Sequence, residues 1–293
     1  MGPSLAVKPI DLLPSRPQAF WGWPAVLNFF LGGLGAGFYV VTVLAEGPGG
    51  RSAVMTLAAW LAPACVLAGF AAVAAEAGRP LRGPRVLFRV GTSWMSRELW
   101  LGGAFVALVL ADGLRPLGPL RAGAAVAALV LAIAQGFIVR GARGIPAWNV
   151  PVMPTLFGLS ALVSGGGLYL VVAVSVRRVP SVPALAAVLM LLIGGVWMWV
   201  RYLTWSSEAA FTEAVAPLTR GREARLVVGA GLMAPLLLTA GAAAWPAVAA
   251  PALALAGILM VLGQLHAKAR LVLTAGRLRP VTLAGLRIKG RAR

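Results

Sequence analysis

The sequence predicts an all-α protein, a polytopic bundle of about eight transmembrane helices with both termini on one side of the membrane. Hydrophobic residues make up 60% of the 293 residues, charged residues make up only 12%, and the mean hydropathy is +0.88. A soluble protein of average composition carries about 25% charged residues. Several separate apolar runs also reach roughly 20 residues, the length of helix that crosses the hydrocarbon core of a bilayer.

The apolar runs end at prolines, glycines and charged residues, and these breakers divide the chain. The eight expected spans are 23–45, 53–75, 97–117, 120–140, 152–176, 182–203, 225–246 and 248–271. They form one transmembrane domain over 23–271, between an N-terminal extramembrane segment, 1–22, and a basic C-terminal tail, 272–293. Short links at 46–52 and 177–181 favour antiparallel neighbours. No pattern of alternating strand residues appears, and a lipid bilayer admits only helices or a closed barrel.

The net charge of +18 has two possible meanings, a nucleic-acid surface or membrane topology. With eight spans, only five of the 26 lysine and arginine residues fall on the side away from the termini, namely Arg51, Arg115, Arg121, Arg177 and Arg178. The remaining 21 fall on the side of the termini. Basic residues concentrate on the cytoplasmic side of membrane proteins, so this distribution places both termini in the cytoplasm and argues against nucleic-acid binding.

Two residue types that bind redox centres are scarce. The chain has one cysteine, Cys65, expected to be buried within the second span, and one histidine, His266. It therefore forms neither an internal disulfide nor a cysteine-ligated cluster, and a haem with two axial histidines cannot form within it. We expect no haem and no iron–sulfur centre in this chain.

Ionisable side chains inside a membrane are functional candidates because they are costly there. Glu76 ends the second span and Glu98 begins the third, so both are expected near the interface on the side of the termini. Glu46 and Asp112 lie at the other ends of the first and third spans and are expected to be solvated at that interface. No charged residue occupies the middle of any span, which disfavours an ion-coupled transporter.

Three uncharged polar residues lie within spans. Gln135 and Gln264 are interpreted as interhelical hydrogen-bonding residues. Asn28 lies about one turn inside the first span, on the loop-rich side, where a ligand could reach it.

Two glycine-rich stretches also lie within spans. Gly33 and Gly37 form a small-residue face for close helix packing, and Gly165-Gly166-Gly167 is interpreted in the same way, with a hinge or room for a flat ligand left open.

Three short motifs together resemble the NrfD/polysulfide reductase (PsrC-like) membrane-subunit family and the related dimethyl sulfoxide reductase anchors. An aromatic start leads into a glycine-rich first helix; an "HLGRP … SWLSRE"-like stretch precedes the third span; a tryptophan- and proline-rich segment precedes the fifth. The segments are Phe20-Trp21-Gly22-Trp23-Pro24 with Asn28 to Gly33, Glu76-Ala77-Gly78-Arg79-Pro80 with Thr92 to Glu98, and Trp148-Asn149-Val150-Pro151-Val152-Met153-Pro154 with Phe157. With the eight-span layout, the resemblance covers most of the chain.

The resemblance implies a quinone-interacting membrane anchor of the prokaryotic plasma membrane. Family members exchange electrons between menaquinone or ubiquinone and a ferredoxin-like iron–sulfur subunit. That subunit connects to a catalytic subunit, often a molybdopterin enzyme. The chain would then not be catalytic by itself but would belong to a quinone-linked oxidoreductase complex. The resemblance also places the quinone site near the face where the iron–sulfur subunit docks.

The motifs transfer specific roles to specific residues. Glu98 matches the glutamate that is implicated in quinol binding in the family. Glu76 stands where that pattern has a histidine, and Asn28 stands where some members have a quinone-contacting histidine. Both are departures, so proton exchange here would use carboxylates or water.

The residues themselves agree with this role. A carboxylate beside an apolar pocket can exchange protons near neutral pH, as quinol oxidation requires. Arg97, Ser93 and Ser96 stand near Glu98 in the sequence and could supply a charge partner and hydroxyls. The alternative is structural, with Ser93 or Ser96 capping the third helix and Glu98 stabilised by its helix dipole. Trp94 either lines the pocket or belongs to the interfacial aromatic belt.

The expected quinone site therefore comprises seven residues: Asn28, Glu76, Arg79, Ser93, Trp94, Arg97 and Glu98. Two other functions remain open, a membrane transporter and a purely structural anchor of a redox complex.

Overall fold

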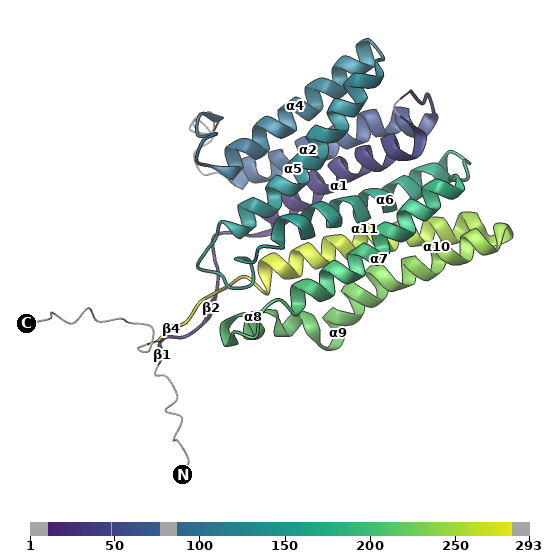
Figure 1. Ribbon diagram of the computed structural model, residues 1–293. Coiled ribbons are helices and arrows are strands. Elements are labelled where there is room, and N and C mark those ends of the chain that lie inside the picture. Colours follow the sequence, from purple (N-terminus) through teal and green to yellow (C-terminus); the bar gives the residue numbers. More distant parts are fainter. Residues whose placement is uncertain (1–10, 48, 77–86, 283–293) are drawn as a thin grey trace, which may run out of the picture.

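A computed structural model describes residues 11–47, 49–76 and 87–282 of the chain (Figure 1). Within these residues, eight helical segments are long and apolar enough to cross a membrane, which confirms the all-α, multi-pass architecture. They are α1 (Trp23–Glu46), α2 (Ala53–Glu76), α4 (Trp94–Leu114), α5 (Gly118–Arg140), α6 (Met153–Ser175), α7 (Val182–Leu203), a seventh segment (Gly221–Ala244) and an eighth (Pro246–Leu273).

The last two spans are composite. The seventh joins α9 (Gly221–Ala224), the π-helix η2 (Arg225–Met233) and α10 (Ala234–Ala244); the eighth joins the 3-10 turn η3 (Pro246–Val248) and α11 (Ala249–Leu273). A further short helix, α8 (Ala209–Thr219), occupies part of the link expected at 204–224.

The third span begins earlier than its apolar pattern indicates. It was expected at residue 97, but α4 begins at Trp94 because Ser93 caps it: the Ser93 hydroxyl oxygen accepts a hydrogen bond from the Ser96 backbone N–H at 3.4 Å. This capping satisfies one of the free N–H groups of the first turn. Glu98 consequently lies just over one helical turn inside α4.

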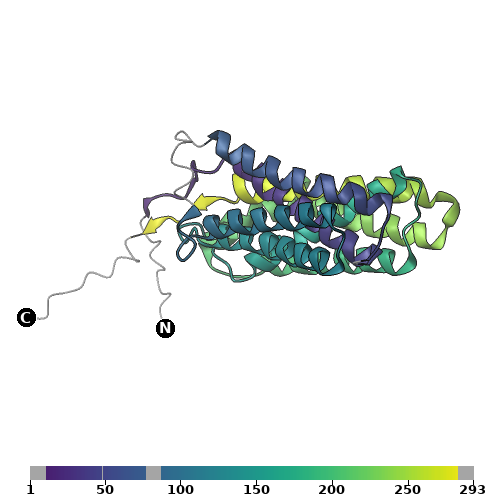
Figure 2. The ribbon, with the colours of Figure 1, turned by 90° about the horizontal axis from the view of Figure 1, so that it is seen from above.

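The helices run along one common direction, and the described ends of the chain emerge together from one end of the bundle (Figure 2). There β1 (Asp11–Leu13) pairs with β4 (Val281–Thr282), and β2 (Arg16–Pro17) pairs with β3 (Arg277–Leu278), both antiparallel. We call this the terminal end, and the other the opposite end. The even number of spans explains why both described ends lie at the same end.

The helices α1 and α6 lie in the middle of the bundle and are the most buried spans. Small residues allow their close approach. A Cβ on Gly37 would overlap the Ala161 carbonyl, and one on Gly165 would overlap the Gly37 backbone. The interpretation of Gly37, Gly165 and Gly167 as close-packing positions is confirmed. Gly33 faces Ala161 of α6 and also makes room for the Lys268 side chain, and Gly166 has only ordinary van der Waals neighbours. Cys65, expected to be buried, is only half-buried, because α2 lies at the periphery.

On the periphery, α2 and α4 contact each other near their midpoints. A Cβ on Gly102 of α4 would lie 2.5 Å from the Phe70 ring of α2 and 3.4 Å from Val66. A cavity lies on each side of this contact, one toward each end of the bundle.

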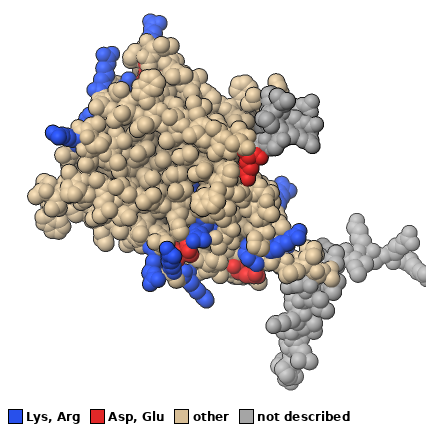
Figure 3. Space-filling view, turned by 180° about the vertical axis from the view of Figure 1, so that it is seen from behind, with Lys and Arg blue, Asp and Glu red and all other residues tan. Residues whose placement is uncertain are grey.

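Lysine and arginine side chains gather toward the two ends of the molecule, and the broad surface between them is almost free of charge (Figure 3). The two carboxylates expected to be solvated at the opposite end are instead paired. Arg121 Nε donates to Asp112 Oδ2 at 2.7 Å, and Arg178 Nη1 lies 2.9 Å from Glu46 Oε2. Both carboxylates are buried, so pairing with arginine replaces their hydration.

Candidate functional site

Three polar side chains from three different helices meet inside the terminal half of the bundle. Asn28 Nδ2 of α1 and Gln135 Nε2 of α5 each donate a hydrogen bond to Glu98 Oε1 of α4, both at 3.0 Å. Gln135 Nε2 also lies 3.2 Å from the Asn28 carbonyl oxygen, which accepts from it. Glu98 is 4% exposed and Gln135 is fully buried. The interpretation of Gln135 as an interhelical hydrogen-bonding residue is confirmed.

Glycines provide the room for this cluster. A Cβ on Gly32 would overlap the Gln135 amide, and one on Gly69 of α2 would lie 3.2 Å from the Asn28 backbone. The glycine-rich stretch of α1 therefore does more than allow close helix packing. It also leaves space for the polar Gln135 side chain of α5 inside the bundle.

The cluster forms the inner wall of a cavity of about 470 Å³ between α1, α2 and α4. Asn28 and Glu98 supply its polar atoms in the interior, and Glu76, which is exposed, stands at its rim. The remaining lining is apolar and aromatic: Phe20, Trp21, Ala25, Phe29, Phe70, Val73, Ala74, Met95, Leu99 and Ile138. Small-molecule sites commonly have volumes of roughly 300–1,000 Å³, with apolar walls and a few polar groups.

An aromatic network fixes the wall nearest the terminal end. Trp21 stacks on Trp148 with ring centroids 4.9 Å apart and an interplanar angle of 20°, and it meets Phe29 edge-on at 5.4 Å. Trp148 is anchored in turn, because its Nε1 donates to the Leu271 carbonyl oxygen at 2.9 Å. Segments that carry the first and third motifs thus pack together, with Phe29 also edge-on to Phe157 at 5.6 Å.

Two buried polar atoms of the cluster have no hydrogen-bond partner among the described residues, Asn28 Oδ1 and Gln135 Oε1. Buried polar atoms are almost always paired, so such atoms point to a missing water or ligand. Asn28 lines the cavity, and its Oδ1 lies 3.3 Å from the position that a Cβ on Gly69 of α2 would occupy.

Lys268, one of the 21 basic residues expected on the side of the termini, is buried inside the bundle. It is 3% exposed, its Nζ donates to the Phe29 carbonyl oxygen at 3.0 Å, and it lies 5.3 Å from the centre of the Phe157 ring. Lys268 Nζ and Gln135 Oε1 both lie within 4 Å of the position a Cβ on Gly33 would occupy. The Gln135 amide therefore bonds to the Glu98 carboxylate and lies in the same region as the buried Lys268 side chain.

Three expected site residues lie beside the cavity rather than in its lining. Trp94 stacks on Phe137 with centroids 4.2 Å apart, and the Arg97 guanidinium lies 4.3 Å from the Trp94 ring centre. Arg97 donates to the carbonyl oxygens of Val90 and Gly91, so it holds the loop before α4 and is not the charge partner of Glu98. Ser93 caps α4, and Arg79 lies outside the described residues.

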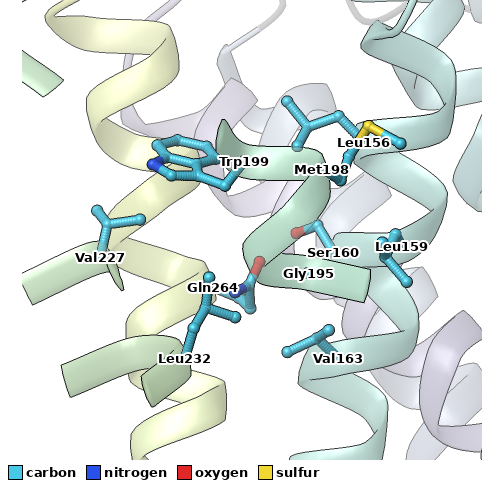
Figure 4. A pocket seen from close by; sticks show the side chains of 10 residues that line it. All are labelled: Leu156, Leu159, Ser160, Val163, Gly195, Met198, Trp199, Val227, Leu232 and Gln264. Atoms are coloured by element: carbon cyan, nitrogen blue, oxygen red, sulfur yellow. The ribbon is translucent and has the colours of Figure 1, made fainter. Parts of the chain in front are cut away.

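Two much smaller cavities lie among α6, α7, η2 and α11. Each has about 20 Å³, room for one water molecule, and they share Ser160, Trp199 and Gln264. Figure 4 shows these polar side chains gathered in the first of the two. Ser160 Oγ and Trp199 Nε1 are buried and have no hydrogen-bond partner among the described residues. Gln264, expected to bond across helices, lines this space.

No protein-family model matches the chain, and no curated protein matches it either.

Proposed function

We propose that this protein is the quinone-binding membrane subunit of an iron–sulfur oxidoreductase complex in a prokaryotic plasma membrane. The observation that supports this most directly is a buried carboxylate, Glu98, in the wall of a cavity lined mainly by apolar and aromatic residues. A quinone headgroup is flat and apolar apart from its two oxygens. It matches a cavity with aromatic walls and a small number of polar atoms.

The chemistry assigns separate tasks to the polar groups. Oxidation of a quinol breaks two O–H bonds and releases two protons and two electrons. The Glu98 carboxylate accepts one proton from a quinol hydroxyl, Asn28 holds Glu98 from α1, and the second proton passes to water at the rim beside Glu76. The two amide N–H donors hold Glu98 in place at Oε1, so Oε2 is not engaged by them.

Protons and electrons would leave toward the terminal end. Glu76 lines the same cavity and is exposed, so it connects the buried carboxylate with water at the rim. Electrons pass to a ferredoxin-like iron–sulfur subunit docked on the basic terminal end, and from there to a catalytic, molybdopterin-type subunit. Menaquinone and ubiquinone both fit this scheme.

Quinone binding is tested by titrating the purified protein with short-chain menaquinone and ubiquinone analogues and following tryptophan fluorescence. Quinones quench nearby indoles, and Trp21 lines the cavity. We expect saturable quenching that is reduced in Trp21→Phe and preserved in Trp245→Phe, whose side chain is exposed at the opposite end. Absence of saturable binding to the wild-type protein would refute the proposed function and leave a transporter or a purely structural anchor.

A transporter is the second candidate, and one observation favours it. Transporters carry ionisable residues within their helix bundles, and Glu98 and Lys268 are both buried here. The expected lack of charged residues in the middle of the spans therefore disfavours a transporter less strongly. Proteoliposomes that accumulate a solute or discharge an imposed proton gradient, without added quinone, would favour this function over electron transfer.

A further inference from the structure

A cavity larger than the candidate quinone site lies at the opposite end, on the far side of the Gly102 contact. It has about 740 Å³ and separates the first half of α2 from the last part of α4. Its lining includes Met55, Thr56, Ala59 and Trp60 of α2, and Val109, Leu110, Asp112, Gly113 and Leu114 of α4. We call this cavity the α2/α4 groove.

The polarity of the α2/α4 groove changes along its length. Arg51, Ser52 and Arg121 lie where α2 and α5 begin, at the membrane boundary. Farther into the span the lining is apolar, and several of its side chains are exposed: Trp60 is 69% exposed, and Leu110 is 53% exposed. The groove therefore opens sideways to the acyl chains of the bilayer and presents its polar groups at the level of lipid headgroups.

The polar end carries a net positive charge. The carboxylate in the lining, Asp112, is already engaged, since it accepts from Arg121 Nε at 2.7 Å and from the Leu117 backbone N–H at 3.0 Å. Arg51 makes no ion pair within the described part of the chain. Ser52 caps α2 by accepting from the Met55 N–H at 3.1 Å, so the positive end of that helix dipole also faces this region.

We propose that the α2/α4 groove binds one phospholipid with an anionic headgroup. The phosphate would lie against Arg51 and the first turn of α2, and the acyl chains would run along Trp60 and Leu110 toward the middle of the bundle. The occupant matches the groove in three respects: it is negative where the groove is positive, apolar where the groove is apolar, and oriented as lipids in that leaflet are. This site is independent of the proposed quinone function.

The test is native mass spectrometry of the full-length protein released from nanodiscs that contain phosphatidylglycerol and phosphatidylcholine in equal amounts. We expect one retained lipid, predominantly phosphatidylglycerol. Arg51→Gln should lower its retention about fivefold, the effect expected for one arginine at an anionic lipid surface. Arg177→Gln, an identical charge change at an exposed residue of the same end outside the groove, should leave retention unchanged.

A second variant tests the apolar part without changing charge. Ala59→Trp should fill the groove and release the lipid while the bundle keeps its thermal stability. Equal retention of the two lipids, retention unaffected by both variants, or displacement of the lipid by inorganic phosphate alone would overturn the proposal. So would a second copy of the chain in place of the lipid, seen as a dimer that Ala59→Trp dissociates.

Discussion

Asn28 on α1 and Glu98 on α4 are joined by a hydrogen bond of 3.0 Å, although 70 positions separate them in the chain. Gln135 completes the arrangement from α5, so one carboxylate oxygen receives two amide donors in a site closed on three sides by helices. This arrangement holds the carboxylate at the wall of an aromatic cavity, and the first prediction concerns this carboxylate.

Glu98→Gln removes the only carboxylate in the interior of the cavity wall and keeps its size. Quinol-coupled turnover of the assembled complex should fall by about 100-fold or more, the loss typical of removing an acid–base group. Assembly should survive, because glutamine still accepts hydrogen bonds. The measurement is quinol oxidation or quinone reduction by purified complex, with Glu213→Gln on the exposed face of α8 as the control. Wild-type turnover in Glu98→Gln would refute the assignment of the site.

Lys268→Met tests the buried ammonium group beside Gln135. The lysine makes one hydrogen bond, to a backbone carbonyl, and its burial costs free energy that a methionine of similar length does not. The variant should unfold at the same or a higher temperature while quinol turnover decreases. Thermal scans in detergent and steady-state turnover check the two parts separately. Raised stability with unchanged turnover would show that Lys268 takes no part in the site.

Gly37→Leu tests the contact between α1 and α6. The new side chain would overlap the Ala161 backbone, so the two central helices must separate. Overpacking of this kind costs about 1–3 kcal/mol, seen as a lower midpoint in thermal or denaturant unfolding. Gly103→Leu is the matched control, since Gly103 is exposed on α4 with no atom within 4 Å of its Cβ position. Equal effects of the two changes would contradict the close packing.

Arg121→Gln tests the buried ion pair at the opposite end. It leaves Asp112 charged with a side chain only 6% exposed, and breaking such a pair costs about 3–5 kcal/mol. The double variant with Asp112→Asn should recover most of this loss, because no charge is then left alone. A double variant as unstable as Arg121→Gln would indicate that the hydrogen bond from Arg121 to the Gly50 carbonyl, and not the pair, supplies the stability.

The distribution of basic residues predicts that the terminal end lies in the cytoplasm. A fluorescent-protein fusion after Arg293 should fluoresce and an alkaline phosphatase fusion there should be inactive, as expected for a cytoplasmic terminus. Insertion of the phosphatase after Val179, between α6 and α7 at the opposite end, should give activity. The reverse pattern would place the terminal end outside the cytoplasm and with it the docking face of any partner.

The sequence predicts the eight spans well because each depends on local composition and length. The close packing at Gly37 follows from spacing alone for the same reason. The partners of Glu98 cannot be predicted from spacing. Asn28, Glu98 and Gln135 belong to three different spans, and only the folded bundle determines which spans are neighbours in space. Because Arg97 is next to Glu98 in the sequence, it was the expected charge partner of Glu98. Successive residues of a helix point in different directions, however, and the Arg97 side chain turns toward the loop before α4.

Residues near span ends are the hardest to place from sequence. Lys268 stands among basic residues close to the C-terminal tail, and nothing local distinguishes it from Arg270 on the same helix. Only the packing of α11 against α1 and α6 turns Lys268 inward and leaves Arg270 half-exposed beside Glu223. Similarly, Asp112 is buried because α5 brings Arg121 to it.

The contact at Gly102 has a mechanical consequence. The Phe70 ring rests where a side chain on residue 102 would stand, so any larger residue there would have to displace that ring. Phe70 also lines the candidate quinone site, so its displacement would change the shape of that cavity. The missing side chain at residue 102 thus helps to set the shape of a cavity that Gly102 itself does not line.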